Sequence, residues 1–177
     1  MNKDRHRFNA TFLIDAETPT RIAILKRSQN KEYAAGFCTG IGGGIGDIAG
    51  LENETIVESA YRELAEETMG VISNENIQVY EFARCKYNSG VIIHYLWGIY
   101  NLDNLPLIDP ADGELIAYPI NEIFNGNEFI PSAKAILNEW IRRGMDTKTK
   151  FTIEVEEVGE DRTVKLIKLN KLYEGIE

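Results

Sequence analysis

The sequence predicts a mixed α/β domain with an added C-terminal β-hairpin. Two amphipathic helical segments, residues 54–68 and 132–143, stand among short runs that are rich in β-branched and aromatic residues. Near the end of the chain, two further runs alternate apolar with charged residues, as the strands of a half-exposed hairpin do. A chain of 177 residues that is 44% hydrophobic can build one core. We therefore expect one domain over residues 1–149 and a hairpin extension over residues 150–177.

The first elements that we expect are two neighbouring strands, residues 11–15 and 21–26, separated by a segment that contains Pro19. Residues 28–48 follow as a long, glycine-rich loop. A loop of this length inside a compact domain is usually functional or mobile. The chain order therefore places a candidate functional loop directly before the first helix.

The first helix is expected over residues 54–68. Its apolar side chains recur at helical spacing, at Ile56, Val57, Ala60, Tyr61 and Leu64. Asn53 or Thr55 can cap the start of this helix, and Gly70 is placed to end it.

A second hairpin is expected at residues 77–87 and 91–100, because both runs are β-branched and aromatic and Asn88-Ser89-Gly90 lies between them. The remaining elements of the domain are a loop at 101–113, a short strand at 115–120, a helical turn at 121–124 and a helix at 132–143 that Gly144 ends. The residues of that helix expected to face inward are Ala133, Ile136, Leu137, Trp140 and Ile141.

The last elements expected are strands at residues 151–158 and 163–169, joined by a charged turn. Their alternation creates one apolar face, made of Phe151, Ile153, Val155, Val164, Leu166 and Leu169. This face must be covered, so we expect the hairpin to pack on the edge of the domain or to pair with a second subunit in a homodimer.

The composition excludes several functional classes. The net charge of −9 argues against a protein that coats DNA or RNA, because such a protein needs a basic face. His6 and His94 are the only histidines, too few for a multi-histidine zinc site. No Gly-Lys dipeptide occurs, so a Walker A loop is excluded. Two cysteines, Cys38 and Cys85, make no disulfide framework.

The sequence also predicts a location. No apolar stretch reaches the length of about 20 residues that a membrane helix needs, and the charged N-terminal segment does not resemble a secretion signal. We therefore expect a cytoplasmic protein that binds no membrane.

Candidate chemistry centres on residues 62–67, Arg-Glu-Leu-Ala-Glu-Glu. Positions three and four apart are neighbours on a helix, so Glu63 is expected beside Glu66 and Glu67. Like charges this close repel one another, and a hard divalent cation such as Mg²⁺, which binds carboxylate oxygens, would relieve the repulsion. Arg62 can pair with Glu66 or with Glu58. A solvated acidic helix face is the alternative interpretation.

Five glycines between residues 40 and 46 precede this helix. Glycines let a backbone approach a ligand closely and turn its carbonyl or N–H groups toward it. A mobile connector is the alternative. A glycine loop that leads into an acidic helix is less expected by chance than either part alone.

Together these segments resemble the Nudix box, G-x5-E-x7-R-E-U-x-E-E-x-G-U, where U is aliphatic. Glu54 stands eight residues before Arg62, as the pattern requires, and residues 62–67 match R-E-U-x-E-E at every position. Residues 36–43, Gly-Phe-Cys-Thr-Gly-Ile-Gly-Gly, resemble the stretch that leads into this box in nucleotide-cleaning members. Two departures occur: Ile48 stands where the box has its first glycine, and the segment after Glu67 is one residue longer.

The resemblance implies the Nudix α/β/α sandwich with a mixed sheet over about residues 8–144. It also implies hydrolysis of a phosphoanhydride bond in a nucleoside diphosphate that is linked to another group. The implied cofactor is Mg²⁺, with Mn²⁺ as an alternative. The implied metal-binding groups are Glu63, Glu66, Glu67 and a backbone carbonyl of Gly42 or Gly43. The implied catalytic set is Arg62, Glu66 and Glu67, in which Arg62 orients Glu54 or Glu66. Asp112 and Glu114 are further candidates to accept a proton from water, with ordinary surface charge as the alternative.

The substrate is expected to be a nucleotide. The chain resembles the branch that cleans oxidised purine nucleotides. Residues 123–131 lie where enzymes of that branch build the pocket for the base. The resemblance therefore implies that Phe124 or Phe129 can stack on the base and that Asn125 can bind its edge. Core packing is the alternative for these aromatic residues. The leading hypothesis is cleavage of a nucleoside triphosphate, such as 8-oxo-dGTP, to the monophosphate and pyrophosphate. The alternatives are hydrolysis of ADP-ribose or a nucleotide sugar, and a Nudix-fold module that binds nucleotide without turnover.

Overall fold

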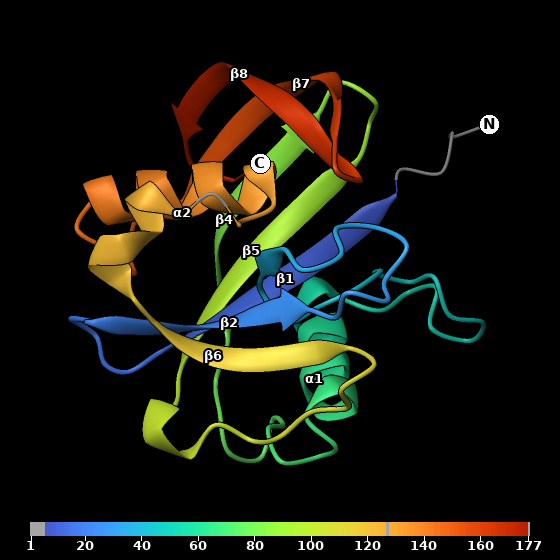
Figure 1. The fold of residues 1–177 in the computed structure, drawn as a ribbon, viewed down its shortest axis with the longest axis vertical. Coiled ribbons are helices and arrows are strands. Elements are labelled where there is room, and N and C mark those ends of the chain that lie inside the picture. Colours follow the sequence, from blue (N-terminus) through green and yellow to red (C-terminus); the bar gives the residue numbers. More distant parts are fainter. Residues whose placement is uncertain (1–5, 127, 177) are drawn as a thin grey trace.

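The computed structural model describes residues 6–126 and 128–176, and a mixed β-sheet forms its centre (Figure 1). The strands are β1 (Arg7–Ile14), β2 (Arg21–Arg27), β3 (Cys38–Thr39), β4 (Tyr80–Tyr87), β5 (Ile92–Ile99), β6 (Gly113–Pro119), β7 (Phe151–Asp161) and β8 (Val164–Glu174). The helices are α1 (Ile56–Glu67) and α2 (Pro131–Arg142), with short 3-10 helices η1 (Leu102–Asn104) and η2 (Ile120–Asn125). No helix in the described ranges is long and apolar enough to cross a membrane.

The sheet runs in the order β3-β2-β1-β5-β4-β7-β8, with β6 paired to β2. The neighbours β1 and β5 are parallel, as are β4 and β7, and the other pairs are antiparallel. The strands expected at 11–15 and 21–26 are confirmed as the antiparallel pair β1–β2, and the hairpin expected at 77–87 and 91–100 is confirmed as β4–β5. The parallel pairs show that the mixed sheet, too, was predicted correctly.

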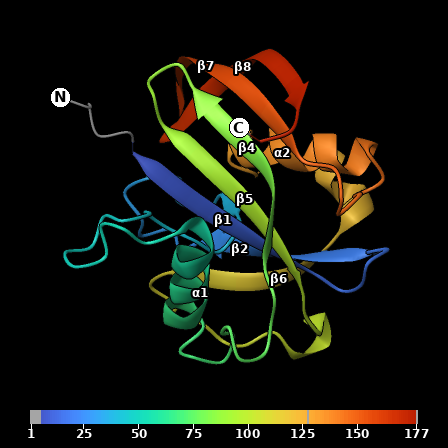
Figure 2. The same cartoon turned by 180° about the vertical axis from the view of Figure 1, so that it is seen from behind.

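Alternate residues of β1 supply two cores on opposite faces of the sheet. Phe12 and Ile14 belong to a cluster that includes Trp140 of α2, whereas Leu13 belongs to a cluster that includes Leu64 of α1. This two-residue alternation is what a strand buried on both faces requires. Figures 1 and 2 show α1 and α2 on opposite sides of the sheet. The expected α/β/α sandwich is confirmed.

Helix α1 begins with a capping box, in which Thr55 accepts a hydrogen bond from the backbone N–H of Glu58 and the Glu58 carboxylate accepts one from Thr55. Thr55, rather than Asn53, is therefore the cap. The expected apolar stripe is correct except at Val57, which is 39% exposed. Its position, about 100° around the helix from Ile56, turns it away from the sheet.

Helix α2 packs its expected apolar face against the sheet. The ring of Trp140 stacks on Phe82 of β4 with the ring centroids 4.1 Å apart. Ile141, expected to face inward, is only partly buried. Gly144, at φ +71°, follows the end of the helix, where its missing side chain permits the left-handed conformation.

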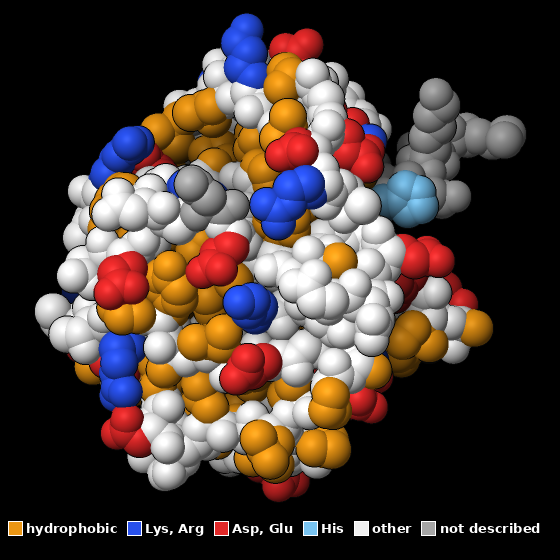
Figure 3. Space-filling model, in the orientation of Figure 1, with side chains coloured by type: hydrophobic (Ala, Val, Ile, Leu, Met, Phe, Trp, Pro, Cys, Tyr) orange, Lys and Arg blue, Asp and Glu red, His pale blue; other side chains and the backbone are white. Residues whose placement is uncertain are grey.

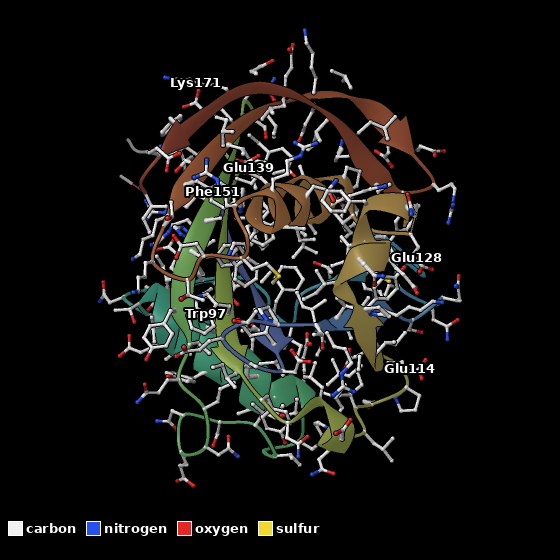
Figure 4. The ribbon with its side chains drawn as sticks, turned by 90° about the vertical axis from the view of Figure 1, so that its left-hand side faces the viewer. Trp97, Glu114, Glu128, Glu139, Phe151 and Lys171 are labelled. Atoms are coloured by element: carbon white, nitrogen blue, oxygen red, sulfur yellow. The ribbon has the colours of Figure 1, made fainter. Side chains whose placement is uncertain are left out.

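The C-terminal hairpin continues the central sheet, because β7 pairs with β4 from Ala83↔Phe151 onward. The hairpin arches over α2, and hydrophobic side chains lie in the hollow between them (Figures 3 and 4). The expected apolar face is correct for its first four residues, but Leu166 and Leu169 are 38% and 52% exposed. Two register shifts between β7 and β8 explain the difference, since each shift interrupts the strict alternation of faces.

Candidate functional site

Arg62 lies at the centre of the candidate site and pairs with Glu54 at two points. Its Nε donates to Oε1 of Glu54 at 2.8 Å, and its Nη2 donates to Oε2 at 3.2 Å. The Glu54 side chain is only 5% exposed and the Arg62 side chain 15%. The hydrogen bonds from Arg62 are the main reason that the pKa of Glu54 lies below its ordinary value. Arg62 therefore holds a buried carboxylate in its ionised form.

The same guanidinium reaches two further carboxylates of α1. Nη1 of Arg62 donates to Oε1 of Glu63 at 2.6 Å and to Oε2 of Glu66 at 3.2 Å. The Glu63 side chain is 13% exposed, whereas that of Glu66 is 55% exposed. Arg62 thus gathers three carboxylates around one positive charge.

Glu67 completes the acidic group without a hydrogen-bond partner of its own. Its Oε2 is buried and accepts no hydrogen bond from the described residues. Burial, followed by the negative charges of Glu63 and Asp112, raises the pKa of Glu67 to about 8. Burial likewise raises the pKa of Glu63. Glu54, Glu63, Glu66 and Glu67 thus place four carboxyl groups beside the single positive charge of Arg62, and a bound cation would favour their ionised forms.

The glycine loop presses against these carboxylates. A Cβ atom on Gly43 would lie 2.5 Å from Oε1 of Glu63, so a side chain there would require this carboxylate to move. Gly44 turns its carbonyl toward α1, where it accepts hydrogen bonds from Nη2 of Arg62 at 2.9 Å and from Oγ of Ser59 at 3.2 Å. The Gly44 carbonyl therefore connects the glycine loop to two side chains of α1.

Strand β1 holds the glycine loop in place. The backbone N–H of Asn9 donates to the Gly43 carbonyl at 2.9 Å, and Thr11 and Ile41 exchange two backbone hydrogen bonds. The Asn9 side chain donates to Oγ of Ser59 at 2.8 Å. These contacts rule against the mobile-connector interpretation of residues 40–44.

A cavity of about 430 Å³ opens beside this loop. It lies within the size range of small-molecule sites in proteins. Gly42 and Gly43 line it at the end near α1, and aromatic side chains form much of its wall, namely Phe8, Tyr33, Tyr87 and Tyr95. The aromatic-walled cavity is therefore separated from Glu63 by the backbone of Gly43, which borders both.

Comparison with solved structures shows which fold this arrangement belongs to. The MutT protein from Bacillus halodurans matches with a TM-score of 0.60 at 14% identity, over 93% of this chain and 97% of that one. A mutT/nudix family protein from Listeria innocua matches with a TM-score of 0.57 at 18% identity, over 82% and 97%. The chain has the Nudix fold. A bifunctional NMN adenylyltransferase/ADP ribose pyrophosphatase from Francisella tularensis also matches, with a TM-score of 0.55 at 16% identity, over 81% of this chain and 42% of that one.

Sequence comparison adds no family assignment. No protein-family model matches the chain, and no curated protein matches it either. The resemblance to the Nudix family is thus confirmed at the level of the fold.

The departures from the Nudix box leave its acidic contacts intact. If Gly43 takes the place of the first glycine of the box, the segment from it to Glu54 is five residues longer than the pattern. Within this segment, residues 47–53 form an exposed loop, in which Ile48 is 42% exposed. Gly46, at φ +69°, turns the chain ahead of this loop, and its N–H donates to Oε2 of Glu54 at 3.3 Å. The insertion therefore lies outside the Arg62 network.

The carboxylates of residues 54–67 do not converge on a single point where a metal ion could bind. In residues 6–126 and 128–176, no three acidic, histidine or cysteine side chains form a group that could hold a metal ion. The reason is visible in the network: Nη1 of Arg62 lies between the carboxylates of Glu63 and Glu66. The donor set nevertheless suits a hard cation, because it consists of carboxylates, one of which has a buried oxygen without a partner.

The residues expected to contact a base do not line the cavity beside Gly43. Phe124 is 40% exposed, and Asn125 is exposed at the end of η2. Phe129 is buried, and its ring packs edge-on against Tyr118 at 5.5 Å, which is the core packing that we gave as the alternative. The next residue, Ile130, lines the cavity instead.

Two later acidic residues have different surroundings. Asp112 lies close enough to raise the pKa of Glu67, and it pairs with Nζ of Lys31 at 2.6 Å. Glu114 is exposed near the start of β6 (Figure 4). Asp112 is therefore the candidate that the structure brings to the acidic group.

Some residues of the site were not found from the sequence. Ser59 and Asn9 are buried polar residues that link α1 to β1, and a polar residue inside an apolar strand was the available signal for Asn9. Cys38, inside the loop, is buried, and burial raises the pKa of its thiol to about 12. It therefore stays protonated and unreactive at neutral pH.

Proposed function

We propose that the chain is an Mg²⁺-dependent hydrolase, active also with Mn²⁺, that cleaves a phosphoanhydride bond of a nucleoside triphosphate to give the monophosphate and pyrophosphate. The observation that carries the proposal is a group of four carboxyl groups on and just before α1, three of which Arg62 contacts, beside the glycine loop that lines the cavity. Such an excess of negative charge is unfavourable without a cation, and the proposed substrate brings its own negative charge to the same place.

Glu63, Glu66 and Glu67 would hold the metal, together with the backbone carbonyl of Gly43. When bound there, the ion would neutralise phosphate oxygens and make a water molecule more acidic. The Gly43 carbonyl already accepts one hydrogen bond, from Asn9, and a carbonyl oxygen has a second lone pair to offer.

Side chains and backbone of the chain would position the carboxylates, accept a proton and contact the phosphates. Arg62 is a positioning residue, because it fixes the carboxylates and lies away from the cavity wall. Oε2 of Glu67 is the oxygen best placed to accept a proton from the attacking water, because no described donor occupies it. The glycine loop would bring backbone close to the phosphate chain.

The substrate is proposed as a purine nucleotide, with an oxidised purine such as 8-oxo-guanine included. The aromatic walls of the cavity suit a planar base, which Phe8, Tyr33 and Tyr87 can contact. This places the base in the cavity rather than at Phe124, Asn125 or Phe129. Hydrolysis of ADP-ribose is the second candidate, supported by the Francisella neighbour whose name includes ADP ribose pyrophosphatase.

Product analysis tests the proposal. The purified chain would be incubated with Mg²⁺ and GTP, 8-oxo-dGTP, ATP, ADP-ribose and a nucleotide sugar, with an EDTA control. We expect nucleoside monophosphate and pyrophosphate from the triphosphates. Release of a sugar phosphate instead would favour the second candidate. Tight nucleotide binding without any cleavage would favour a module that binds nucleotide without turnover.

A further inference from the structure

The C-terminal hairpin reaches the same cavity as the glycine loop. Glu157 of β7 and Lys165 of β8 both line it, together with Gly42 and Gly43. The hairpin lies outside residues 54–70, which carry the Nudix box, so nothing in the box accounts for this contribution. Two opposite charges from one hairpin therefore join a wall whose other described charged residue is Arg27.

The tip of the hairpin is attached to the loop between β2 and the glycines, which supplies part of the same wall. Oγ1 of Thr163 accepts a hydrogen bond from the backbone N–H of Ala34 at 3.0 Å, and the guanidinium of Arg162 lies 4.7 Å from the ring centroid of Phe37. Val164 is buried in a small cluster with Ala34 and Phe37. The hairpin and the loop before the glycines thus form one wall.

Both charged groups can turn to a ligand. Oε1 of Glu157 accepts a long hydrogen bond from Oγ of Ser89, at 3.4 Å, and Oε2 accepts none from the described residues. Lys165 pairs with Glu160 at 3.5 Å, but both side chains are about half exposed, at 46% and 53%. Exposed pairs of this kind contribute little, so the ammonium group is readily redirected.

We propose that Glu157 and Lys165 determine substrate specificity by binding the edge of the nucleobase. The proposal rests on the proposed function, since it uses the same cavity. The phosphate chain belongs at the glycine end, because the carboxylate of Glu157 repels phosphate. A carboxylate binds best to two adjacent N–H donors, and an ammonium group donates to a carbonyl. Guanine presents two N–H groups beside a carbonyl on one edge, whereas adenine presents a single amino group beside a ring nitrogen.

The test compares Glu157→Gln and Lys165→Met with two matched controls from the same hairpin, Glu156→Gln and Lys168→Met. The controls remove the same charges from neighbouring positions that do not line the cavity. For each protein, kcat and KM would be measured with GTP and ATP. The dissociation constant would be measured by calorimetry with a GTP analogue that has a methylene group between the α and β phosphorus atoms, and thermal unfolding would confirm the fold.

We expect both cavity variants to raise KM for GTP and the dissociation constant of the analogue by about tenfold, with kcat changed less than about twofold. The controls should stay within about twofold of the wild type. The preference for GTP over ATP should fall in Glu157→Gln. If the wild type hydrolyses nucleotides but the cavity variants behave as the controls do, or if it does not distinguish GTP from ATP, the hairpin proposal is wrong while the hydrolase proposal stands.

Binding without cleavage would separate the hairpin proposal from the hydrolase proposal in the opposite way. If the wild type cleaves nothing, but binds the analogue and loses affinity in Glu157→Gln and Lys165→Met, the hairpin proposal holds and the hydrolase proposal fails. If the analogue does not bind at all, both fail.

Discussion

Arg62 and Glu54 form a two-point ion pair that joins the middle of α1 to the residue just before its N-cap. Two nitrogens of the guanidinium donate to the two oxygens of one carboxylate, at 2.8 and 3.2 Å. A planar fork of this kind matches a carboxylate in a way that a lysine ammonium cannot. The pair therefore fixes the direction from which Arg62 approaches Glu63 and Glu66.

Replacing Arg62 by lysine should destabilise the protein by about 1–3 kcal/mol, because Glu54 is nearly buried and would lose one of its two hydrogen bonds from residue 62. Urea unfolding in the absence of metal measures this change. Arg142→Lys is the control, since that side chain is 69% exposed and its replacement should cost less than about 0.5 kcal/mol. Equal stability of the two variants would contradict the structural role given to the pair.

The Gly43→Ala variant should bind metal more weakly. The added Cβ would lie 2.5 Å from Oε1 of Glu63 and would force that carboxylate to move. We expect the affinity for Mn²⁺, measured by calorimetry, to fall about tenfold or more, as it does when the support of a metal ligand is altered. Unchanged Mn²⁺ affinity would remove Gly43 and Glu63 from the metal site.

Contacts between residues close in the sequence were predicted better than contacts between distant segments. Glu66 follows Arg62 by four residues on one helix, so local spacing predicted this ion pair. The pair with Glu54 was expected only from the resemblance to the Nudix box, and the pair with Glu63 was not predicted. The pairing of Gly43 with Asn9 joins segments far apart in the chain, and no local pattern specifies it. The exposed position of Leu169 depends on bulges in the hairpin, which alternation alone does not show.

Stability should depend on pH through Glu81, which lies far from the acidic helix in the sequence. Burial alone would raise the pKa of Glu81, but hydrogen bonds from His94 and Arg84 together lower it below its ordinary value. A lowered folded-state pKa stabilises the protein above the unfolded pKa, and this stabilisation is lost as the pH falls through the folded value. The free energy of unfolding should therefore fall more steeply below pH 4.5 in the wild type than in Glu81→Gln. Parallel curves would contradict the assignment.

The hairpin should be required for stability as well as for the cavity. Phe151 is fully buried, and its ring lies 6.1 Å from that of Phe82 and 4.7 Å from the guanidinium of Arg143. Phe151→Ala should cost about 3–5 kcal/mol. The control Leu169→Ala changes a side chain that is 52% exposed, so it should cost less than about 0.5 kcal/mol. A small effect of Phe151→Ala in thermal or urea unfolding would show that the hairpin is not part of the core.

The most direct test of the central claim is the rate of nucleoside triphosphate hydrolysis with Mg²⁺ in the wild type, Glu66→Gln and Glu75→Gln. Glu66 is 55% exposed, so its replacement should leave the fold intact, and Glu75 is an exposed acid outside the site. We predict that Glu66→Gln lowers kcat about 100-fold while Glu75→Gln keeps the wild-type rate. Equal rates in all three proteins would contradict the assignment of the acidic helix as the catalytic centre.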